Sequence, residues 1–221
     1  MRIVSASSRV ALDRLVSRDA ARDPRVEQQA AAIVADVRKR GDRALIDWTK
    51  RLGGGARFQL RPLSKAELRA GWRETPKDVR RALRVAIDNL SAVAARQVPQ
   101  PFVVQVAPGH RIEQRVAPLS RVGCYVPGGR YPLPSTLVMT AVPAKAAGVP
   151  EIVVVCPRPA PVVLAAALEV GVSEFWAIGG AQAIGALAYG TKRIRRVDKI
   201  VGPGNAWVAD AKALVARDCP I

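Results

Sequence analysis

From residue 122 onward, short apolar runs alternate with segments in which apolar residues recur at helical spacing. The apolar runs predict four strands, over residues 122–126, 152–156, 175–178 and 199–201. Each strand is followed by a predicted helix, over residues 135–147, 162–169, 181–189 and 205–216. Strands that are apolar on both faces and alternate with helices are typical of a parallel sheet covered on two sides. We therefore predict an α/β fold with a Rossmann-like, parallel-sheet lobe over residues 122–221.

Residues 1–121 show mainly helical patterns, with a few short strands. Asp23 followed by Pro24 predicts the start of a helix, because Asp can cap a helix and proline fits its first turn. Further helices are predicted over 42–52, from a capping box at 64–67, and from Thr75-Pro76 to about Gln97. Strands are predicted over 58–60 and, as two or three strands around a Pro108-Gly109 turn, over 102–122. We therefore predict a mainly helical segment, residues 1–121, ahead of the lobe.

The chain is strongly basic, with 35 Lys and Arg against 18 Asp and Glu and a net charge of +17. A basic surface invites an interpretation as a nucleic-acid-binding protein. However, the arginines are dispersed along the predicted helices among acidic residues. The dense runs, 38–40 and 192–196, also contain no aromatic residue for base stacking. We therefore expect arginine-rich, solvated helix faces and no nucleic-acid partner.

The apolar runs are far shorter than the ~20 residues of a transmembrane helix. Residues 1–10 carry two arginines and no apolar stretch of the kind found in secretory signals. Three cysteines, Cys124, Cys156 and Cys219, are widely spaced and form neither a disulfide framework nor a zinc-finger pattern. These features predict a soluble, cytoplasmic protein with no membrane partner.

His110, in a Pro-Gly-His turn, is the only histidine of the chain. General acid–base enzymes and zinc enzymes use histidine more than any other side chain. Because this chain has a single imidazole, it cannot form a two-histidine zinc site alone. We expect His110 to be a turn residue. Either the chemistry uses other side chains, or it lies outside this chain.

Three of the predicted strands end in glycine-rich turns that lead into helices, at residues 125–129, 178–182 and 201–205. The carboxyl ends of parallel strands share one edge of a sheet, where doubly wound folds bind ligands. Glycine permits tight turns and close approach of a ligand, and the N–H groups of a following helix favour phosphate. Tyr125, Gln182 and Asn205 are then polar side chains at one rim, suited to the ribose, amide and base of a nucleotide.

The formation of turns alone would also explain these glycines, and that alternative stays open. Neither a Walker loop nor a complete G-x-G-x-x-G occurs, since Gly202-Pro203-Gly204 lacks the third glycine. Cys124 is expected to be a packed strand residue rather than a nucleophile, because no histidine lies near it in the sequence. Asp198 is expected to pin a turn, and Ser135 and Thr136 to cap a helix.

Three ordered motifs in this region resemble histidinol dehydrogenase. The first is Gly-Cys-Tyr-Val-Pro-Gly-Gly at 123–129, with Pro-Ser-Thr at 134–136 and Met139. The second is Gly-Gly-Ala-Gln-Ala-Ile at 179–184, with Ala-Tyr-Gly-Thr at 188–191. The third is Val-Asp-Lys-Ile-Val-Gly-Pro-Gly-Asn at 197–205. Together they cover about residues 120–218, and the first 120 residues agree in helical organisation and in the segment 115–119.

The resemblance implies a zinc-containing, NAD-dependent oxidoreductase of histidine biosynthesis. It would oxidise L-histidinol to L-histidine through the aldehyde, in two hydride transfers. The resemblance further implies that Tyr125, Gln182 and Asn205 contact NAD. It also implies that the full-length enzyme is a homodimer whose active sites draw on both subunits.

The resemblance implies, in addition, that this chain lacks part of the enzyme. Family members are considerably longer, and their zinc ligands, their Glu–His acid–base pair and their substrate-binding serine match no residue here. We therefore expect an N-terminal fragment, incomplete at the C-terminal end of its Rossmann-like lobe. Such a fragment would hold no catalytic residue and no metal ligand, and would be inactive by itself. The alternative is a truncated, non-catalytic basic module that binds a partner through its charge.

Overall fold

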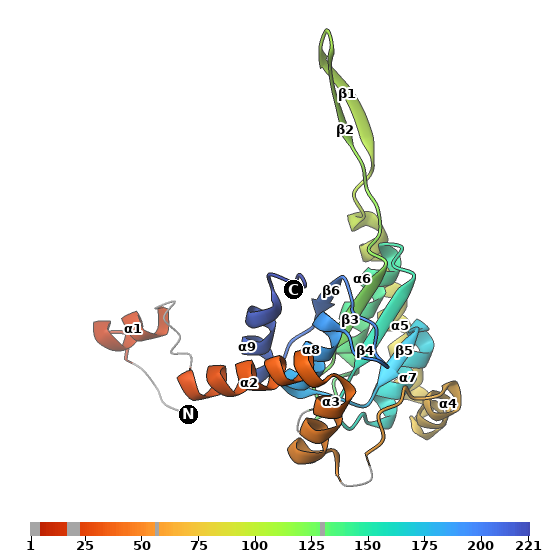
Figure 1. Cartoon of the computed structure of the whole chain (residues 1–221). Coiled ribbons are helices and arrows are strands. Elements are labelled where there is room, and N and C mark those ends of the chain that lie inside the picture. Colours follow the sequence, from red (N-terminus) through yellow and green to blue (C-terminus); the bar gives the residue numbers. More distant parts are fainter. Residues whose placement is uncertain (1–4, 17–22, 56–57, 129–130) are drawn as a thin grey trace.

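The core of the protein is a four-stranded parallel sheet (Figure 1). The structure is a computed structural model and describes residues 5–16, 23–55, 58–128 and 131–221. The strands are β3 (Arg121–Tyr125), β4 (Glu151–Val155), β5 (Glu174–Trp176) and β6 (Lys199–Val201), in the order β5-β4-β3-β6. The predicted α/β fold with a Rossmann-like parallel sheet is confirmed.

Side chains of β4 alternate between two hydrophobic cores, one on each face of the sheet. Ile152 and Val154 belong to one core, whereas Val153 and Val155 belong to the other, and all four are buried. Successive side chains of a strand point to opposite faces, so a strand covered on both sides needs apolar residues at every position. This is why β4 reads as a continuous apolar run in the sequence.

Helices from both halves of the chain cover each face of the sheet (Figure 1). One face carries α2 (Pro24–Arg40), α3 (Asp42–Thr49), α8 (Gly180–Tyr189) and α9 (Ala206–Val215). The other face carries α4 (Lys65–Glu74), α5 (Lys77–Gln97), α6 (Pro134–Ala146) and α7 (Pro161–Val170). The N-terminal helices therefore share the hydrophobic cores of the lobe. The division of the chain into segments 1–121 and 122–221 stays a prediction.

Two helices begin at the caps that the sequence predicts, whereas α6 begins after Leu133 without the side-chain cap expected from Ser135 and Thr136. At the start of α2, the Oδ1 atom of Asp23 accepts a hydrogen bond from the N–H of Arg25 at 2.9 Å. At the start of α4, the N–H of Glu67 donates to the Ser64 hydroxyl at 3.2 Å, and the Glu67 carboxylate accepts from the Ser64 N–H at 2.8 Å. These bonds satisfy N–H groups that a helix start leaves free, and an N-cap contributes about 0.5–2 kcal/mol.

The strand predicted over residues 58–60 is wrong. The structure assigns no strand there, and the next residues meet the edge strand β5 only through a single bridge between Pro62 and Trp176. Leu63 adds one hydrogen bond, from its N–H to the Phe175 carbonyl at 2.7 Å. Because proline has no N–H to donate, the pairing with β5 does not extend into a strand.

Two further differences concern helices. The helix predicted over 42–52 is α3 followed by a π-helical turn, η1 (Lys50–Gly54), in which Gly53 has a φ of 109°. Glycine adopts this conformation readily, whereas a residue with a β-carbon does so at a cost, so the chain leaves the helix here. The structure also contains α1 (Arg9–Val16), which was not among the predicted elements.

An antiparallel hairpin, β1 (Phe102–Ala107) and β2 (His110–Gln114), projects from the rest of the molecule (Figure 1). Its turn lies at Pro108-Gly109, as predicted, and Gly109 has a φ of 80°. Large apolar side chains stay exposed along it: Phe102, Val103, Val104, Val106 and Ile112. Isolated two-stranded hairpins are at best marginally stable. Because these side chains are exposed, the hairpin presents an apolar surface that no other described residue covers.

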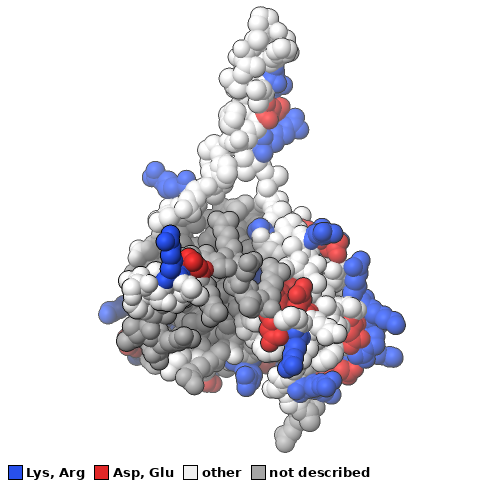
Figure 2. Space-filling view, turned by 90° about the vertical axis from the view of Figure 1, so that its left-hand side faces the viewer, with Lys and Arg blue, Asp and Glu red and all other residues white. Residues whose placement is uncertain are grey.

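Positive and negative side chains lie next to one another over the surface (Figure 2). Arg40 pairs with Asp36 and Asp47, at 2.6 and 2.8 Å, and Arg84 pairs with Glu169 at 3.1 Å. Basic side chains are thus paired with acidic ones on these helices, and the expected absence of a nucleic-acid partner stays a prediction. Of the helices that the structure describes, none combines the length and the apolar character that crossing a membrane requires.

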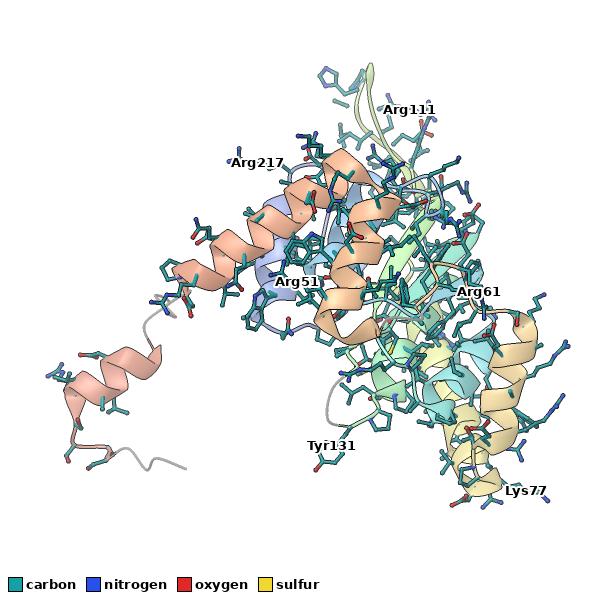
Figure 3. All side chains as sticks on the ribbon, turned by 60° about the horizontal axis from the view of Figure 1, so that its bottom comes forward. Arg51, Arg61, Lys77, Arg111, Tyr131 and Arg217 are labelled. Atoms are coloured by element: carbon teal, nitrogen blue, oxygen red, sulfur yellow. The ribbon has the colours of Figure 1, made fainter. Side chains whose placement is uncertain are left out.

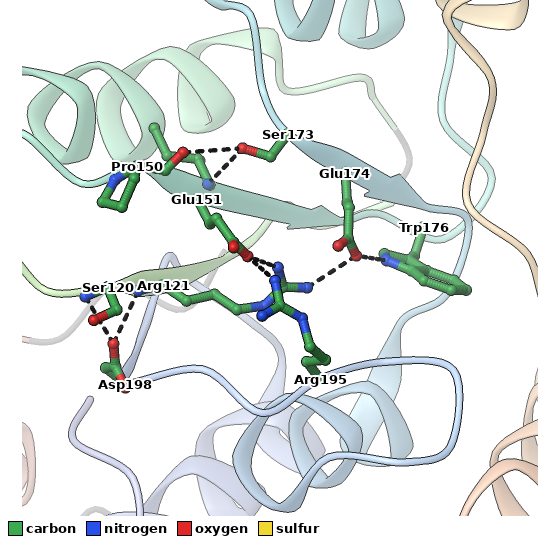
Figure 4. Close-up of polar contacts among 10 residues, drawn as sticks. Ser120, Arg121, Pro150, Glu151, Ser173, Glu174, Trp176, Arg195 and Asp198 are labelled. Atoms are coloured by element: carbon green, nitrogen blue, oxygen red, sulfur yellow. Dashed lines mark hydrogen bonds and ion pairs between the residues drawn. The ribbon is translucent and has the colours of Figure 1, made fainter.

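At the amino ends of the strands, a group of ion pairs ties three strands together (Figure 4). Arg121, at the start of β3, is buried and pairs with Glu151 of β4 and, at 2.9 Å, with Glu174 of β5. Arg195 also contacts Glu151. Asp198 accepts hydrogen bonds at 2.9 Å from two consecutive backbone N–H groups, one of them that of Arg121. This edge of the sheet serves the fold, and Asp198, which was expected to pin a turn, instead ties the residue before β6 to the start of β3.

Candidate functional site

The strand order of the sheet reverses at β3. Strands β4 and β5 extend the sheet on one side of β3, whereas β6 pairs with its other side. In open α/β sheets, ligands bind in the crevice beyond the carboxyl ends of the strands at such a reversal. A cleft of about 670 Å³ lies at this place, and segments that follow all four strands line it.

Tyr125, Gln182 and Asn205 all line this cleft. They come from three different segments: the end of β3, the first turn of α8 and the residue that caps α9. The structure therefore brings together the three side chains that the sequence predicts at one rim. That these side chains contact NAD stays a prediction.

Tyr125 is buried, and its hydroxyl oxygen accepts a hydrogen bond from the N–H of Gly180 at 3.0 Å. Gly180 is the first residue of α8, so this bond uses one of the N–H groups that a helix start leaves free. Burial raises the pKa of Tyr125 above its ordinary value, and the phenol is therefore protonated at neutral pH. A hydroxyl that accepts one bond still has its own hydrogen to donate, so Tyr125 can donate to a ligand.

Gln182 is 3% exposed, and its Oε1 atom has no hydrogen-bond partner within the described residues. A buried polar atom without a partner costs about 1–3 kcal/mol, and such atoms are few in folded proteins. The carboxamide lies over the start of its own helix, because a β-carbon built at Gly180 would stand 2.6 Å from Oε1. Gln182 thus lines the cleft and has an acceptor atom whose bonding capacity is unused, and Gly180 leaves room for its carboxamide.

Asn205 caps helix α9. Its Oδ1 atom accepts a hydrogen bond from the N–H of Val208 at 3.1 Å. This bond orients the side chain and leaves the amide nitrogen, a donor of two hydrogen bonds, for other partners. Together with Tyr125 and Gln182, the cleft therefore offers two donor groups and one acceptor.

The N-terminal helices α2 and α3 also line the cleft, and the sequence analysis did not predict this contribution. Gln29 of α2 accepts a hydrogen bond from the indole N–H of Trp207 in α9 at 3.0 Å, and both residues line the cleft. Trp48 and Thr49 of α3 line it too, and the buried Oγ1 atom of Thr49 has no partner among the described residues. No local motif marks these side chains, because they reach the cleft only through the packing of α2 on α8 and α9.

Most glycines of the three turns are required by the protein itself. A β-carbon at Gly128 or Gly179 would overlap Pro157, which lies in the turn after β4. A β-carbon at Gly202 would overlap a backbone carbonyl of β3. Gly128, Gly179 and Gly202 therefore allow these segments to pack closely together. Packing within the protein accounts for these three glycines without a ligand. Gly129 lies outside the described residues.

The other candidates from the sequence do not join the cleft. Burial raises the pKa of Cys124 to about 11 and that of Cys156 to about 12, so neither thiol is ionised at neutral pH. Cys124 is thus the packed strand residue that the sequence predicts. His110 lies at the tip of the projecting hairpin. Within the described ranges, no three His, Cys, Asp or Glu side chains are grouped so that they could hold a metal ion.

Known proteins match this chain along most of its length. A family profile described as histidinol dehydrogenase matches residues 16–221. Histidinol dehydrogenase of Bordetella parapertussis is 45% identical over 213 residues, which make up 94% of this chain and 48% of that relative. Histidinol dehydrogenase of Aromatoleum aromaticum is 46% identical over 211 residues, or 92% of this chain and 48% of that relative. The chain spans about half the length of the curated relatives it matches.

The fold agrees with these matches. The crystal structure of histidinol dehydrogenase from Elizabethkingia anophelis superposes with a TM-score of 0.82 at 29% sequence identity. The superposition covers 87% of this chain and 45% of that structure's chain. Because the family profile also matches nearly the whole chain, the chain belongs to the histidinol dehydrogenase family.

Proposed function

We propose that this chain is the nucleotide-binding part of an oxidoreductase that oxidises L-histidinol to L-histidine through the aldehyde, with NAD as the hydride acceptor. The names of the relatives support the substrate. The observation that carries the proposal is Gln182, which lines the cleft where the strand order reverses and whose buried Oε1 atom has no hydrogen-bond partner among the described residues. A ligand with hydrogen-bond donors would satisfy this atom at the place where doubly wound folds bind nucleotides.

In this proposal the residues of the chain bind and orient the cofactor. Bound NAD supplies the carbon that accepts hydride. Gln182 accepts a hydrogen bond from a ligand hydroxyl or amide, whereas Tyr125 and Asn205 donate to ligand oxygens. Trp48 and Trp207 provide aromatic surface for a planar ring. Because the cap at Asn205 and the bond from Gly180 to Tyr125 exist before binding, the ligand meets side chains that are already oriented.

The residues of this chain do not fit a zinc site. A catalytic zinc ion takes three protein ligands, and no suitable group of side chains occurs among the described residues. We therefore propose that the zinc ligands and the acid–base residues of the enzyme lie outside this chain, and that the chain alone is inactive. Turnover of L-histidinol, followed by NADH absorbance, or one zinc per chain after mild chelation would contradict this.

We also propose that the full-length protein is a cytoplasmic homodimer. The exposed apolar hairpin supports an interface, since large unpartnered apolar patches mark contact surfaces. Three buried, unpaired thiols suit a reducing compartment. Val104 and Ile112 are cross-strand partners in the hairpin, so the double variant Val104→Lys, Ile112→Lys should weaken the dimer in light scattering. An unchanged molar mass would count against the hairpin as the interface.

Titration with NAD⁺ tests the proposed function directly, and Trp48 and Trp207 allow it to be followed by fluorescence. Gln182→Ala should raise the Kd for NAD⁺ about two- to tenfold, the effect of one lost hydrogen bond. Asn205→Ser should have a similar effect, because serine keeps a capping oxygen for α9 but lacks the amide donor. Gln97→Ala, at the exposed end of α5, is the matched control. The proposal fails if the parent does not bind NAD⁺, or if all variants bind it equally well.

A further inference from the structure

Lys212 of α9 carries a half-buried ammonium group. Its Nζ atom donates a hydrogen bond to the backbone carbonyl of Gly202, in the turn after β6. No carboxylate of the described residues forms an ion pair with it. Burial lowers the pKa of Lys212, and the neighbouring charge of Lys199 lowers it further. Burying a charge that no opposite charge compensates lowers the stability of a fold, so stability does not explain this lysine.

The turn that Lys212 contacts spans residues 202–204. Gly202 has a φ of 106°, and a β-carbon there would lie 2.1 Å from the backbone oxygen of Tyr125. One side of the turn is therefore in close contact with the end of β3. Pro203 has no N–H to donate, so this turn has few backbone bonds available to hold it. Of the described side chains, only that of Lys212 forms a hydrogen bond with the turn.

The turn leads directly into the candidate site. Asn205 follows it, lines the cleft and caps α9, while Tyr125 lines the cleft from the end of β3. A shift of the turn would therefore change the distance between these two side chains. The cations that line the cleft are Arg51, labelled in Figure 3, and Arg158, and Lys212 is not among them. Any effect of Lys212 on a ligand in the cleft is thus exerted through the turn.

We propose that Lys212 is a positioning residue for the cofactor: through the Gly202 carbonyl, its ammonium group keeps Asn205 in place. The inference rests on the proposed function, because it concerns the same cleft. A charge-assisted hydrogen bond is stronger than a neutral one, so it restrains the turn effectively. Side chains that are held in place before binding lose less freedom when the ligand arrives, which raises affinity. The buried charge of Lys212 thus lowers the stability of the fold and raises the affinity of the site.

Lys212→Met tests this proposal, because methionine retains an unbranched apolar side chain and removes both the charge and the donor. The Kd for NAD⁺ should rise about two- to tenfold, the effect of one lost hydrogen bond. The urea midpoint of unfolding should stay equal or rise, since an apolar side chain in place of a buried, uncompensated charge is neutral or stabilising. A merely structural role predicts the opposite pattern, in which the variant loses stability.

Lys199→Met is the matched control. The Nζ atom of Lys199 donates to the backbone oxygen of Ile221 at 2.9 Å and not to the turn, so this variant should leave the Kd for NAD⁺ within about twofold.

Three outcomes would overturn the inference and leave the proposed function intact. The first is that Lys212→Met binds NAD⁺ as tightly as the parent. The second is that Lys212→Met unfolds at a lower urea concentration or does not fold, which would show a structural role. The third is that Lys199→Met loses as much affinity as Lys212→Met, so that positive charge in general determines binding. Failure of the parent to bind NAD⁺ would overturn the inference together with the proposed function.

Discussion

Replacing Gly180 by alanine tests the candidate site with a single methyl group. Gly180 has a φ of 72°, and a β-carbon there would lie 2.6 Å from the Oε1 atom of Gln182 and 3.2 Å from its Cδ atom. These atoms are the far end of a flexible side chain. The fold can therefore accept the change, while the carboxamide of Gln182 has to turn out of its present place.

Gly180→Ala has two effects that can be measured separately. A positive φ costs a residue with a β-carbon roughly 1–2 kcal/mol of stability. Displacing the carboxamide removes one hydrogen bond to the ligand, about 0.5–1.5 kcal/mol, which raises the Kd for NAD⁺ about two- to tenfold. Gly171→Ala is the matched control, because Gly171 has a φ of 78° at the end of α7 and its β-carbon would meet only Lys145 Nζ, at 3.9 Å.

Urea unfolding measures the first effect, and titration with NAD⁺ measures the second. Both variants should lose a similar free energy of unfolding, whereas only Gly180→Ala should lose affinity. If the parent and Gly180→Ala bind NAD⁺ with the same Kd, Gln182 is not in contact with the ligand and the reasoning is refuted. If Gly171→Ala loses as much affinity as Gly180→Ala, binding follows stability and not the position of the carboxamide.

Three further predictions concern charged residues. The hydrogen bond from Arg40 lowers the pKa of Asp36 from 3.8 to about 2, so the stability that this pair contributes is present above about pH 4 and is lost as the pH falls through 2. Asp36→Asn should flatten this part of the stability profile, followed through the fluorescence of Trp48, whose indole N–H donates to Asp36 at 2.8 Å. Arg121→Gln should lower the free energy of unfolding by about 3 kcal/mol, because it leaves Glu174 without its buried cation. A loss below about 1 kcal/mol would mean that the Arg121–Glu174 ion pair contributes no more than an exposed one. Duplex and single-stranded DNA should bind weakly and lose affinity steeply with added salt, so specific binding at physiological salt would contradict the interpretation of dispersed charge.

Local signals predicted the elements whose interactions join residues close in sequence. Asp23 and the capping box at 64–67 form their bonds within three residues, so the sequence contains all that the helix start needs. The strand expected over 58–60 failed because a strand depends on a partner that is distant in the sequence. That partner, β5, is three residues long, and Pro62 interrupts the pairing.

One rule of topology was enough to predict that three polar side chains share one rim. Parallel strands end at the same edge, so Tyr125, Gln182 and Asn205 could be placed together without knowledge of the strand order. Thr49 was missed because it faces the cleft only through the packing of distant helices. Arg158 was missed because its turn contains no glycine; its position directly after the second predicted strand was the available signal.

The sequence by itself determined most of the helices and the four strands of the parallel sheet, because periodicity and caps depend on neighbours along the chain. Only the tertiary structure decided what each buried face packs against. It placed β6 beside β3, and so created the reversal at which the cleft lies. It also laid α2 and α3 along the cleft as a second wall. The physical reason is that the hydrophobic effect is non-directional: an apolar face requires burial, but only the joint packing of the whole chain selects its partner.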